Sequence, residues 1–196
     1  MRKLVLSLVV SVDGYINGPG GEFIGPEWSA DLDGWNERMF ARFDTLIYGR
    51  TSWEKMAEFW PAAGRDKTLP APMQRLAVFM NDSRKIVFSR PRQDISAWQN
   101  SELRAEPVGV AVESEKQRSG KDLVVFAGAI MAQSALRARL VDEIWLLTIP
   151  ELFGHGTRLF EGHNLRSRLE LLEEARMDTG AIFTRYAVSN PTATGQ

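Results

Sequence analysis

Residues 46–53 carry the clearest set of side chains that could bind an anion. An apolar run ends at Gly49, and Arg50, Thr51 and Ser52 follow it as a helix-like segment begins. Glycine lets the backbone turn where a strand meets a helix, and the first N–H groups of a helix, with its positive dipole end, favour an anion. Arg50 adds a forked cation suited to phosphate. The same residues also fit a helix N-cap beside a surface cation, so the stretch alone leaves both interpretations open.

Two further strand ends carry residues of the same kind. Ser89 and Arg90 follow one apolar run, and the small residues Ala127, Gly128 and Ala129 follow another. Taken singly, the first pair fits a solvated basic turn, and the small residues fit tight packing of a helix on a sheet. Because ligands of open α/β sheets bind beyond the carboxyl ends of the strands, the three turns together predict a nucleotide site on one rim. None has the Walker or dinucleotide-fold glycine pattern, which disfavours those two classes.

Strands alternate with helices along the chain, which predicts the α/β class. Strands are expected at 4–12, 45–48, 85–88, 103–106, 122–126 and 144–150, and helices at 26–43, 49–56, 71–79, 110–118 and 130–139. The segments 169–177 and 181–188, turned at 178–180, predict an antiparallel hairpin. The expected fold is a mostly parallel central sheet with an antiparallel C-terminal edge strand and flanking helices. It forms one domain over 1–189, followed by a flexible tail at 190–196.

The carboxylates of Asp31 and Asp33 are candidates for proton transfer. They stand near the start of the helix expected at 26–43, for which Ser29 is a suitable N-cap. Acids at that place also complement the helix dipole, which is the simpler interpretation. At about 100° per residue the two side chains lie roughly 200° apart, so only one can face a given site. Asp31 shares its helix face with Trp35, which slightly favours Asp31.

Composition excludes several classes of function. The chain has 196 residues and a net charge of −1 with no basic block, which argues against nucleic acid as a partner. It has no cysteine, which excludes thiolate chemistry and fits a reducing, cytoplasmic compartment. His155 and His163 are too few for a multi-histidine metal site. No stretch is long enough to span a bilayer, so neither a metal nor a membrane enters the expected function.

Several stretches resemble the dihydrofolate reductase-like family, and more closely its branch that contains the reductase domain of bifunctional riboflavin-biosynthesis enzymes. They span nearly the whole chain in the family's order, at 11–16, 48–54, 85–90, 140–150, 153–156 and 159–160. The resemblance implies the family's three-layer sandwich and a stand-alone reductase module, without the zinc-binding deaminase domain. It also implies a homodimer.

Matched position by position, the resemblance implies ten cofactor-binding residues and NADPH as the cofactor. Those of the pyrophosphate grip and the phosphate bridge are Gly49, Arg50, Thr51, Ser52, Gly128 and Ala129. Ser89 and Arg90 are on the 2′-phosphate and adenine side, which implies NADPH rather than NADH. Val9 and Ile16 match positions whose backbone holds the nicotinamide carboxamide. The family usually has two glycines, commonly joined by a cis peptide, where this chain has Ala127 and Gly128.

The resemblance further implies hydride transfer to a small pyrimidine- or pterin-like heterocycle, as in 5-amino-6-(5-phosphoribosylamino)uracil reductase. In dihydrofolate reductases a carboxylate on the first helix supports protonation of the substrate. Counting back from Gly49 matches that carboxylate to Asp33, whereas the local pattern around residue 31 matches it to Asp31, and both registers stay open. The alternatives are a dihydrofolate reductase and, from another class, a nucleotide-binding module without turnover.

Overall fold

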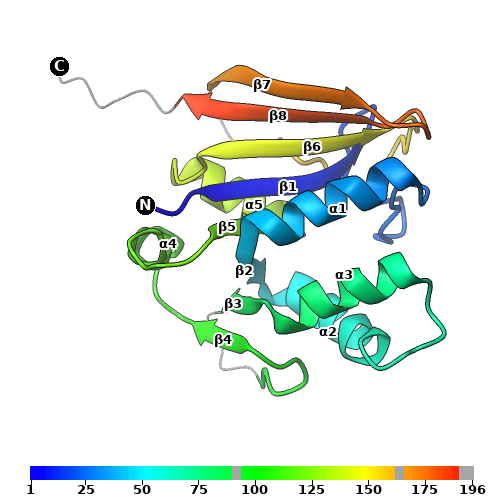
Figure 1. The fold of residues 1–196 in the computed structure, drawn as a ribbon. Coiled ribbons are helices and arrows are strands. Elements are labelled where there is room, and N and C mark those ends of the chain that lie inside the picture. The colour runs from blue at the N-terminus through cyan, green and yellow to red at the C-terminus, as the bar shows by residue number, and fades with distance from the viewer. Residues whose placement is uncertain (90–93, 162–165, 190–196) are drawn as a thin grey trace.

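The computed structural model describes residues 1–89, 94–161 and 166–189. Their strands form one eight-stranded sheet with helices on its faces (Figure 1). The strands are β1 (Leu4–Ser11), β2 (Phe43–Gly49), β3 (Arg84–Phe88), β4 (Ser101–Arg104), β5 (Asp122–Val125), β6 (Glu143–Ile149), β7 (Arg168–Arg176) and β8 (Ile182–Ser189). The helices are α1 (Ala30–Arg42), α2 (Arg50–Ala63), α3 (Ala71–Asp82), α4 (Val108–Lys116) and α5 (Ala129–Arg137). No helix in these three ranges is long and apolar enough to cross a membrane.

The strands follow the order β4-β3-β2-β5-β1-β6-β8-β7 across the sheet. β1 lies between β5 and β6 and runs parallel to both, and β2 runs parallel to β3 and β5. β8 pairs antiparallel with β6 and with β7. The predicted α/β class, parallel centre and antiparallel C-terminal edge are therefore confirmed. Because parallel strands end on the same side, the turns after β1, β2, β3 and β5 lie along one rim.

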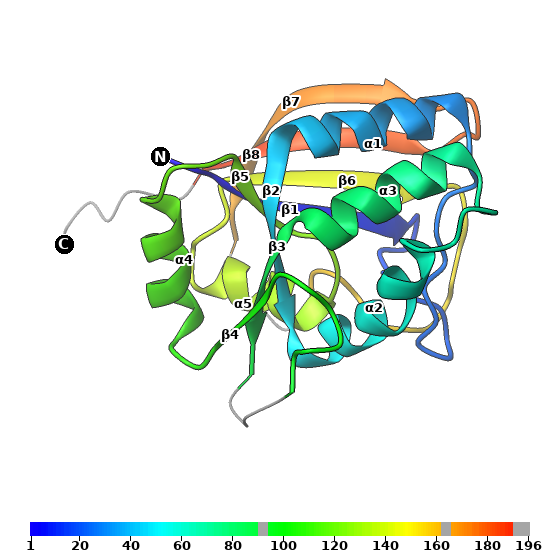
Figure 2. The ribbon, with the colours of Figure 1, turned by 60° about the horizontal axis from the view of Figure 1, so that its bottom comes forward.

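Two apolar cores lie on the two faces of the sheet, and together they make the predicted three-layer sandwich. Leu32 of α1, Trp53 of α2 and Leu76 of α3 belong to one core, and residues of α4 and α5 to the other (Figure 2). Val5 of β1 faces the first core and Leu4 the second. A strand buried on both faces must be apolar at successive positions, which is why residues 4–12 lack polar alternation.

α1 is shorter than the helix predicted over 26–43. It begins at Ala30 because Ser29 caps it, and the Ser29 hydroxyl accepts a hydrogen bond from the N–H of Leu32 at 3.2 Å. It ends before Phe43, whose backbone is extended and opens β2. The cap predicted from the sequence is confirmed, and it also explains why residues 26–29 are not helical.

Three other elements, α2, β4 and α4, also differ from their predicted bounds. α2 continues past Met56 to Ala63, because Trp53 and Trp60 both bury their rings in the core and hold the later turns in place. β4 and α4 each begin two residues earlier than the strand predicted at 103–106 and the helix predicted at 110–118. The tail predicted at 190–196 lies outside the described residues.

A buried cluster of ion pairs fastens α4 to the edge of the sheet. Glu115 is 1% exposed, and its carboxylate lies 2.6 Å from Arg84, 3.2 Å from Arg104 and 3.7 Å from Arg2. Burial raises the pKa of the Glu115 carboxyl, but the hydrogen bonds and charge of Arg84, helped by Arg118 and Arg104, outweigh it and hold the pKa below its ordinary value. The ionised carboxylate is therefore the form that the fold stabilises.

Candidate functional site

Two helices begin side by side at the rim where β2 and β5 end. β2 and β5 are neighbours in the sheet; α2 starts directly after β2, and α5 starts shortly after β5. Gly128, which precedes α5, has a φ of +97°, a conformation that side chains rarely adopt. A Cβ on Gly128 would also collide with the Ser52 hydroxyl of α2. The two helix starts therefore approach so closely that a glycine is required between them.

The first N–H groups of both helices lack a side-chain cap. Gly49 precedes α2 and Gly128 precedes α5, and neither helix has an acidic residue in its first turn. α1, in contrast, is capped by Ser29 and carries Asp31 and Asp33 in its first turn. Open N–H groups and two positive dipole ends at one place are the arrangement that favours an anion.

The polar side chains predicted for the phosphate grip lie at these helix starts. Arg50 and Thr51 are exposed, Ser52 is half-buried, and Ala129 is the buried first residue of α5. Arg50 lies 3.4 Å from Glu54, one turn further along α2. Exposed ion pairs of this kind are weak, so the guanidinium is free to turn toward an anion. The structure thus brings together the six residues that the family resemblance implies for the pyrophosphate and its bridge.

The turn before α5 has the trans backbone of an ordinary loop. The peptide bond between Ala127 and Gly128 is trans, as are the other peptide bonds in the described ranges. The cis bond that is common in the resembling family is therefore not formed here. Gly128 alone has a positive φ in this turn, so the chain bends without a second glycine.

Of the two residues predicted to contact the adenosine half of the cofactor, Ser89 lies within the described residues. Ser89 directly follows β3, the next strand along the rim from β2, and it is buried. Its N–H donates to the carbonyl of Arg104 at 3.2 Å, which ties the turn to β4. Arg90, the predicted partner of Ser89 at the 2′-phosphate, lies outside the described residues.

Val9 and Ile16 pack on different faces of the sheet. Val9, near the end of β1, is half-buried against the core beneath α1, α2 and α3, whereas Ile16 packs against the other core. The N–H of Ile16 donates to the carbonyl of Thr157 at 3.0 Å and is therefore engaged within the chain. Both residues lie at the carboxyl end of β1, but their side chains do not meet there.

The two candidate acids of α1 lie on different sides of the helix. Asp31 is exposed, and its Oδ2 accepts a hydrogen bond from the N–H of Asp178, in the turn between β7 and β8, at 2.8 Å. Asp33 is half-buried, and its Oδ2 lies 3.7 Å from Arg75 of α3. Asp33 Oδ1 is buried and has no hydrogen-bond partner in the described chain. A buried acceptor without a partner is costly, and a donor from a ligand would satisfy it.

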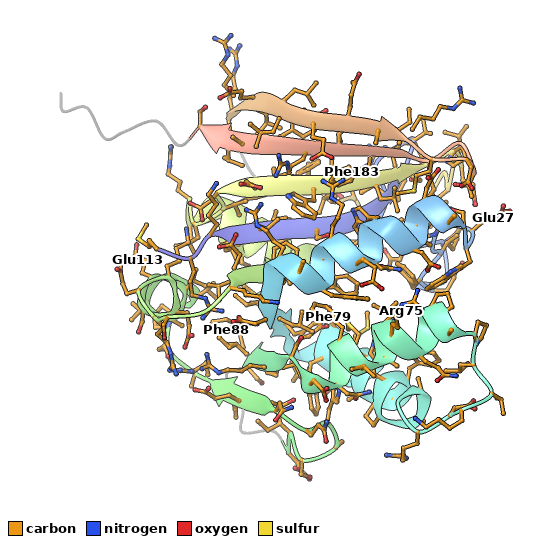
Figure 3. All side chains as sticks on the ribbon, in the orientation of Figure 1. Glu27, Arg75, Phe79, Phe88, Glu113 and Phe183 are labelled. Carbon is orange, nitrogen blue, oxygen red and sulfur yellow. The ribbon has the colours of Figure 1, made fainter. Side chains whose placement is uncertain are left out.

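Arg75 is a neighbour of the candidate acid Asp33 that the sequence did not reveal. It lies on the side of α3 that faces α1 (Figure 3), where it donates to Glu37 at 2.8 Å and approaches Asp33. The two helices meet through Phe40 and Phe79, whose ring centroids are 4.8 Å apart. No local pattern could have indicated Arg75, because its approach to Asp33 depends on how α1 packs against α3.

A third acid, Asp13, joins the loop after β1 to the loop after β6. Its carboxylate accepts hydrogen bonds from the Ser11 hydroxyl at 2.6 Å and from the N–H groups of Phe153 and Gly154 at 3.1 and 2.8 Å. The Ser11 hydrogen bond, against the opposing effect of burial and together with the two N–H donors, lowers the pKa of Asp13 to about 2. Asp13 directly follows the strand predicted at 4–12, and the sequence did not reveal these contacts.

The Asp13 clamp should open in acid. Because its folded-state pKa lies below the ordinary 3.8, the ionised carboxylate stabilises the contact above about pH 4, and the contact is lost as pH falls through about 2. The amide NMR signals of Phe153 and Gly154 should shift with a midpoint near that pH, and Asp13→Asn should abolish the transition. The Thr157 amide, which donates to the uncharged Asn17, is the internal control and should not follow it. A midpoint near pH 4 would show that the carboxylate is not clamped.

Sequence comparison assigns the chain to a family. The model of the RibD C-terminal domain matches residues 2–183, which is nearly the whole chain. The protein belongs to the RibD C-terminal domain family. This is a reductase-related family of the riboflavin pathway, so the rim described above belongs to an oxidoreductase scaffold.

Three relatives match this RibD C-terminal domain over nearly its whole length. The uncharacterized protein YyaP of Bacillus subtilis (strain 168) is 28% identical over 189 residues, which cover 94% of each chain. A provisionally named riboflavin biosynthesis protein of Shewanella sp. PV-4 superposes with a TM-score of 0.74 at 18% identity, covering 97% of this chain and 100% of that one. Dihydrofolate reductase of Enterococcus faecalis, solved with NADP(H), gives 0.61 at 17% identity, covering 96% and 97%. The two structures show that the fold is dihydrofolate reductase-like.

Proposed function

We propose that this RibD C-terminal domain is an NADPH-dependent reductase that acts on a pyrimidine- or pterin-like heterocycle. The observation that carries the proposal is the pair of adjoining, uncapped helix starts at Gly49 and Gly128, with Arg50 beside them. A dinucleotide carries the negative charge of its pyrophosphate at the middle of the molecule, and such a place suits that charge.

The rim suits the negative charge of NADPH. The N–H groups at the starts of α2 and α5 would hold the pyrophosphate, and a Cβ at Gly128 would close the approach between the two helices. Arg50 would add the cation, and Ser89 lies where the adenosine half would extend along the rim. The dihydrofolate reductase matched above was solved with NADP(H) in the same fold, which supports this choice of cofactor. NADPH supplies a hydride when bound.

Asp33 is the residue that we assign to protonation of the substrate. Its buried Oδ1 has no donor in the described chain, and an N–H of a heterocycle can provide one. Arg75 lies 3.7 Å from the other oxygen and pairs with it. Asp33 would orient the heterocycle and assist the proton that must accompany the hydride, directly or through water. Asp31 is less suited, because it is exposed and already accepts the N–H of Asp178.

Reduction of dihydrofolate is the second candidate. The unpartnered oxygen of Asp33 favours it, because the resemblance implies such a carboxylate on the first helix of dihydrofolate reductases. The family model favours the riboflavin-pathway substrate instead. Separate incubations with dihydrofolate and with 5-amino-6-(5-phosphoribosylamino)uracil, followed by the absorbance of NADPH, distinguish the two. NADPH binding without oxidation by either substrate would favour a nucleotide-binding module without turnover.

Arg50→Ala should weaken NADPH binding by about 1–3 kcal/mol, because a charge-assisted hydrogen bond to phosphate is lost. Arg65→Ala is the matched control, since it removes an exposed arginine just beyond the other end of the same helix and should leave the affinity unchanged. Calorimetric titration of each variant with NADPH and with NADH measures the difference. If Arg50→Ala and the unchanged protein bind NADPH with equal affinity, Arg50 does not contact the phosphate. If neither nucleotide binds at about millimolar concentration, the proposed function is wrong.

A further inference from the structure

A buried lysine joins three parts of the fold: the end of α3, the start of β3 and the segment before β4. Lys85 is 0% exposed, and its ammonium group donates to the carbonyl oxygens of Asn81 and Ser83 at 2.7 and 2.8 Å. It also donates to the carbonyl of Gln99 at 3.0 Å, and its nitrogen lies 4.6 Å from the ring centroid of Trp98. The three donors of one ammonium group thus serve three carbonyl groups, and an aromatic ring adds a cation–π contact.

The positive charge of Lys85 is held without an ion pair in the described part of the chain. Asp82, at the end of α3, acts on it through its charge and raises its pKa. Arg84, the preceding residue of β3, points to the other side of the strand, where it pairs with Glu102 and Glu115. The residues that Lys85 contacts before β4 carry no charge. Burial of the ammonium group outweighs Asp82 and lowers the pKa of Lys85 to about 8.

Asn81, which accepts from the ammonium group, also ties α3 to its neighbours. Its side-chain amide donates to the carbonyl of Trp60, in α2, at 2.9 Å, and its Oδ1 accepts the indole N–H of Trp98 at 2.8 Å. Its carbonyl oxygen further accepts the side-chain amide of Asn100 at 3.1 Å. The lysine and Asn81 together therefore fix residues 98–101, called the bridge segment from here on, against α3 and α2.

The bridge segment in turn supports the start of α2, which carries the proposed pyrophosphate grip. The ring of Trp98 packs on that of Tyr48, with centroids 5.8 Å apart, and Tyr48 directly precedes Gly49. The Ser101 hydroxyl accepts the indole N–H of Trp53, in the first turn of α2, at 2.9 Å. Because protein interiors are close-packed, a shift of the bridge segment is transmitted to the helix start.

We propose that Lys85 is a positioning residue whose buried positive charge fixes the bridge segment, and that this segment holds the start of α2 where it binds the cofactor. The effect on the cofactor rests on the proposed function, whereas the contacts with the bridge segment do not. A neutral amine has two N–H donors in place of three and loses the cation–π attraction, so it cannot serve all three carbonyl groups. Loss of the charge should loosen the bridge segment and weaken cofactor binding.

This charge should be lost in mildly alkaline solution, without a loss of global stability. The pKa of Lys85 is about 8 in the folded chain, against an ordinary 10.5. Between these two values the folded chain binds fewer protons than the unfolded chain, so the contribution of Lys85 to the free energy of unfolding increases as pH rises. A fall in cofactor affinity over this range would have the opposite sign and could not come from unfolding through Lys85.

The indole N–H NMR signals of Trp98 and Trp53, followed in the full chain without nucleotide, test the contacts. Both should shift with one midpoint near pH 8, the pKa of Lys85. Trp145, whose indole N–H donates to Glu143, is the internal control and should not follow them. If neither signal moves, or Trp98 moves without Trp53, the charge does not act on α2 and the proposal is overturned. Because no nucleotide is present, this result is independent of whether NADPH binds.

Calorimetric titration with NADPH tests the effect on the cofactor. The affinity of the unchanged protein should be at least about fivefold lower at about pH 9.5 than at about pH 7. Lys85→Met should bind weakly at both pH values, whereas Lys67→Met, which removes an exposed lysine, is the matched control and should keep the full dependence. Equal affinities of the unchanged protein at the two pH values, or the same dependence in Lys85→Met, would overturn the proposal.

A second measurement applies if Lys85→Met does not fold. In the unchanged protein with ¹³C-labelled lysine, the NMR signal of the Lys85 ε-carbon reports directly on its protonation. Its midpoint should coincide with those of the Trp98 signal and of the NADPH affinity. A Lys85 midpoint near its ordinary pKa of 10.5, while the other two change near pH 8, would assign both changes to another group and overturn the proposal.

Discussion

Asp33→Asn should lower kcat by about 100-fold or more, within the usual range for a residue that assists proton transfer. The change keeps the shape of the side chain but removes the negative charge next to Arg75 and the basicity of the buried Oδ1. NADPH affinity should stay within about twofold, because Asp33 is on α1 and the proposed phosphate grip is on α2 and α5. The measurement is steady-state oxidation of NADPH with whichever substrate the turnover experiment identifies.

Asp31→Asn is the matched control for this prediction. It makes the same chemical change two residues away, on the side of α1 that faces the turn at Asp178. Its kcat should stay within about threefold of the unchanged protein. If the large loss followed Asp31→Asn and not Asp33→Asn, the proton role would move to Asp31. A loss of NADPH binding in Asp33→Asn would instead show that the residue supports the cofactor site.

Glu115→Gln should reduce the free energy of unfolding by about 1–3 kcal/mol. The neutral amide removes the buried counter-charge of Arg84 and Arg104, although both keep Glu102 as an ion-pair partner. The guanidinium of Arg2 also loses a charged neighbour at 3.7 Å. Urea titrations should therefore show a lower midpoint with an unchanged slope. Glu113→Gln, on the exposed side of the same helix (Figure 3), should change stability by less than about 0.5 kcal/mol.

The dependence of the unfolding free energy on pH is a second test of the role of Glu115. The folded-state pKa of Glu115 is depressed, so its contribution is present above the ordinary carboxyl pKa of about 4.3 and is lost as pH falls through the folded value. The stability of Glu115→Gln should accordingly fall less steeply in that range than the stability of the unchanged protein. Parallel curves would mean that Glu115 is not the group whose protonation weakens the fold.

The helices and strands could be predicted because their signals are local. Ser29 as a cap indicates the start of α1, and the uninterrupted apolar residues indicate β1. Helix ends were less accurate where packing decides them, as where Trp60 carries α2 past Met56. The strand order could not be derived from such signals, because β1 pairs with β5 and β6, which come far later in the chain.

For the candidate site, too, the parts that follow from local sequence could be predicted, and the parts that depend on packing could not. Turns at the carboxyl ends of parallel strands share a rim by geometry, so Gly49 and Gly128 could be placed together from the sequence. The environment of the acids could not. Asp31 is bound to an N–H 147 residues away, and Asp13 to one 140 residues away. The position of Asp33 relative to Arg75 likewise requires the packed helices.

The central place of β1 has a consequence for synthesis. β1 is translated before β5 and β6, and both of its edges stay without their partners until the ribosome has passed Asp122. Pairings between such distant segments form slowly, because a long loop must close before any contact compensates for the lost entropy. The nascent chain therefore carries an unpaired apolar strand during most of its elongation. We expect chaperones that hold unfolded chains to bind this segment during translation, and to release it when β6 has emerged.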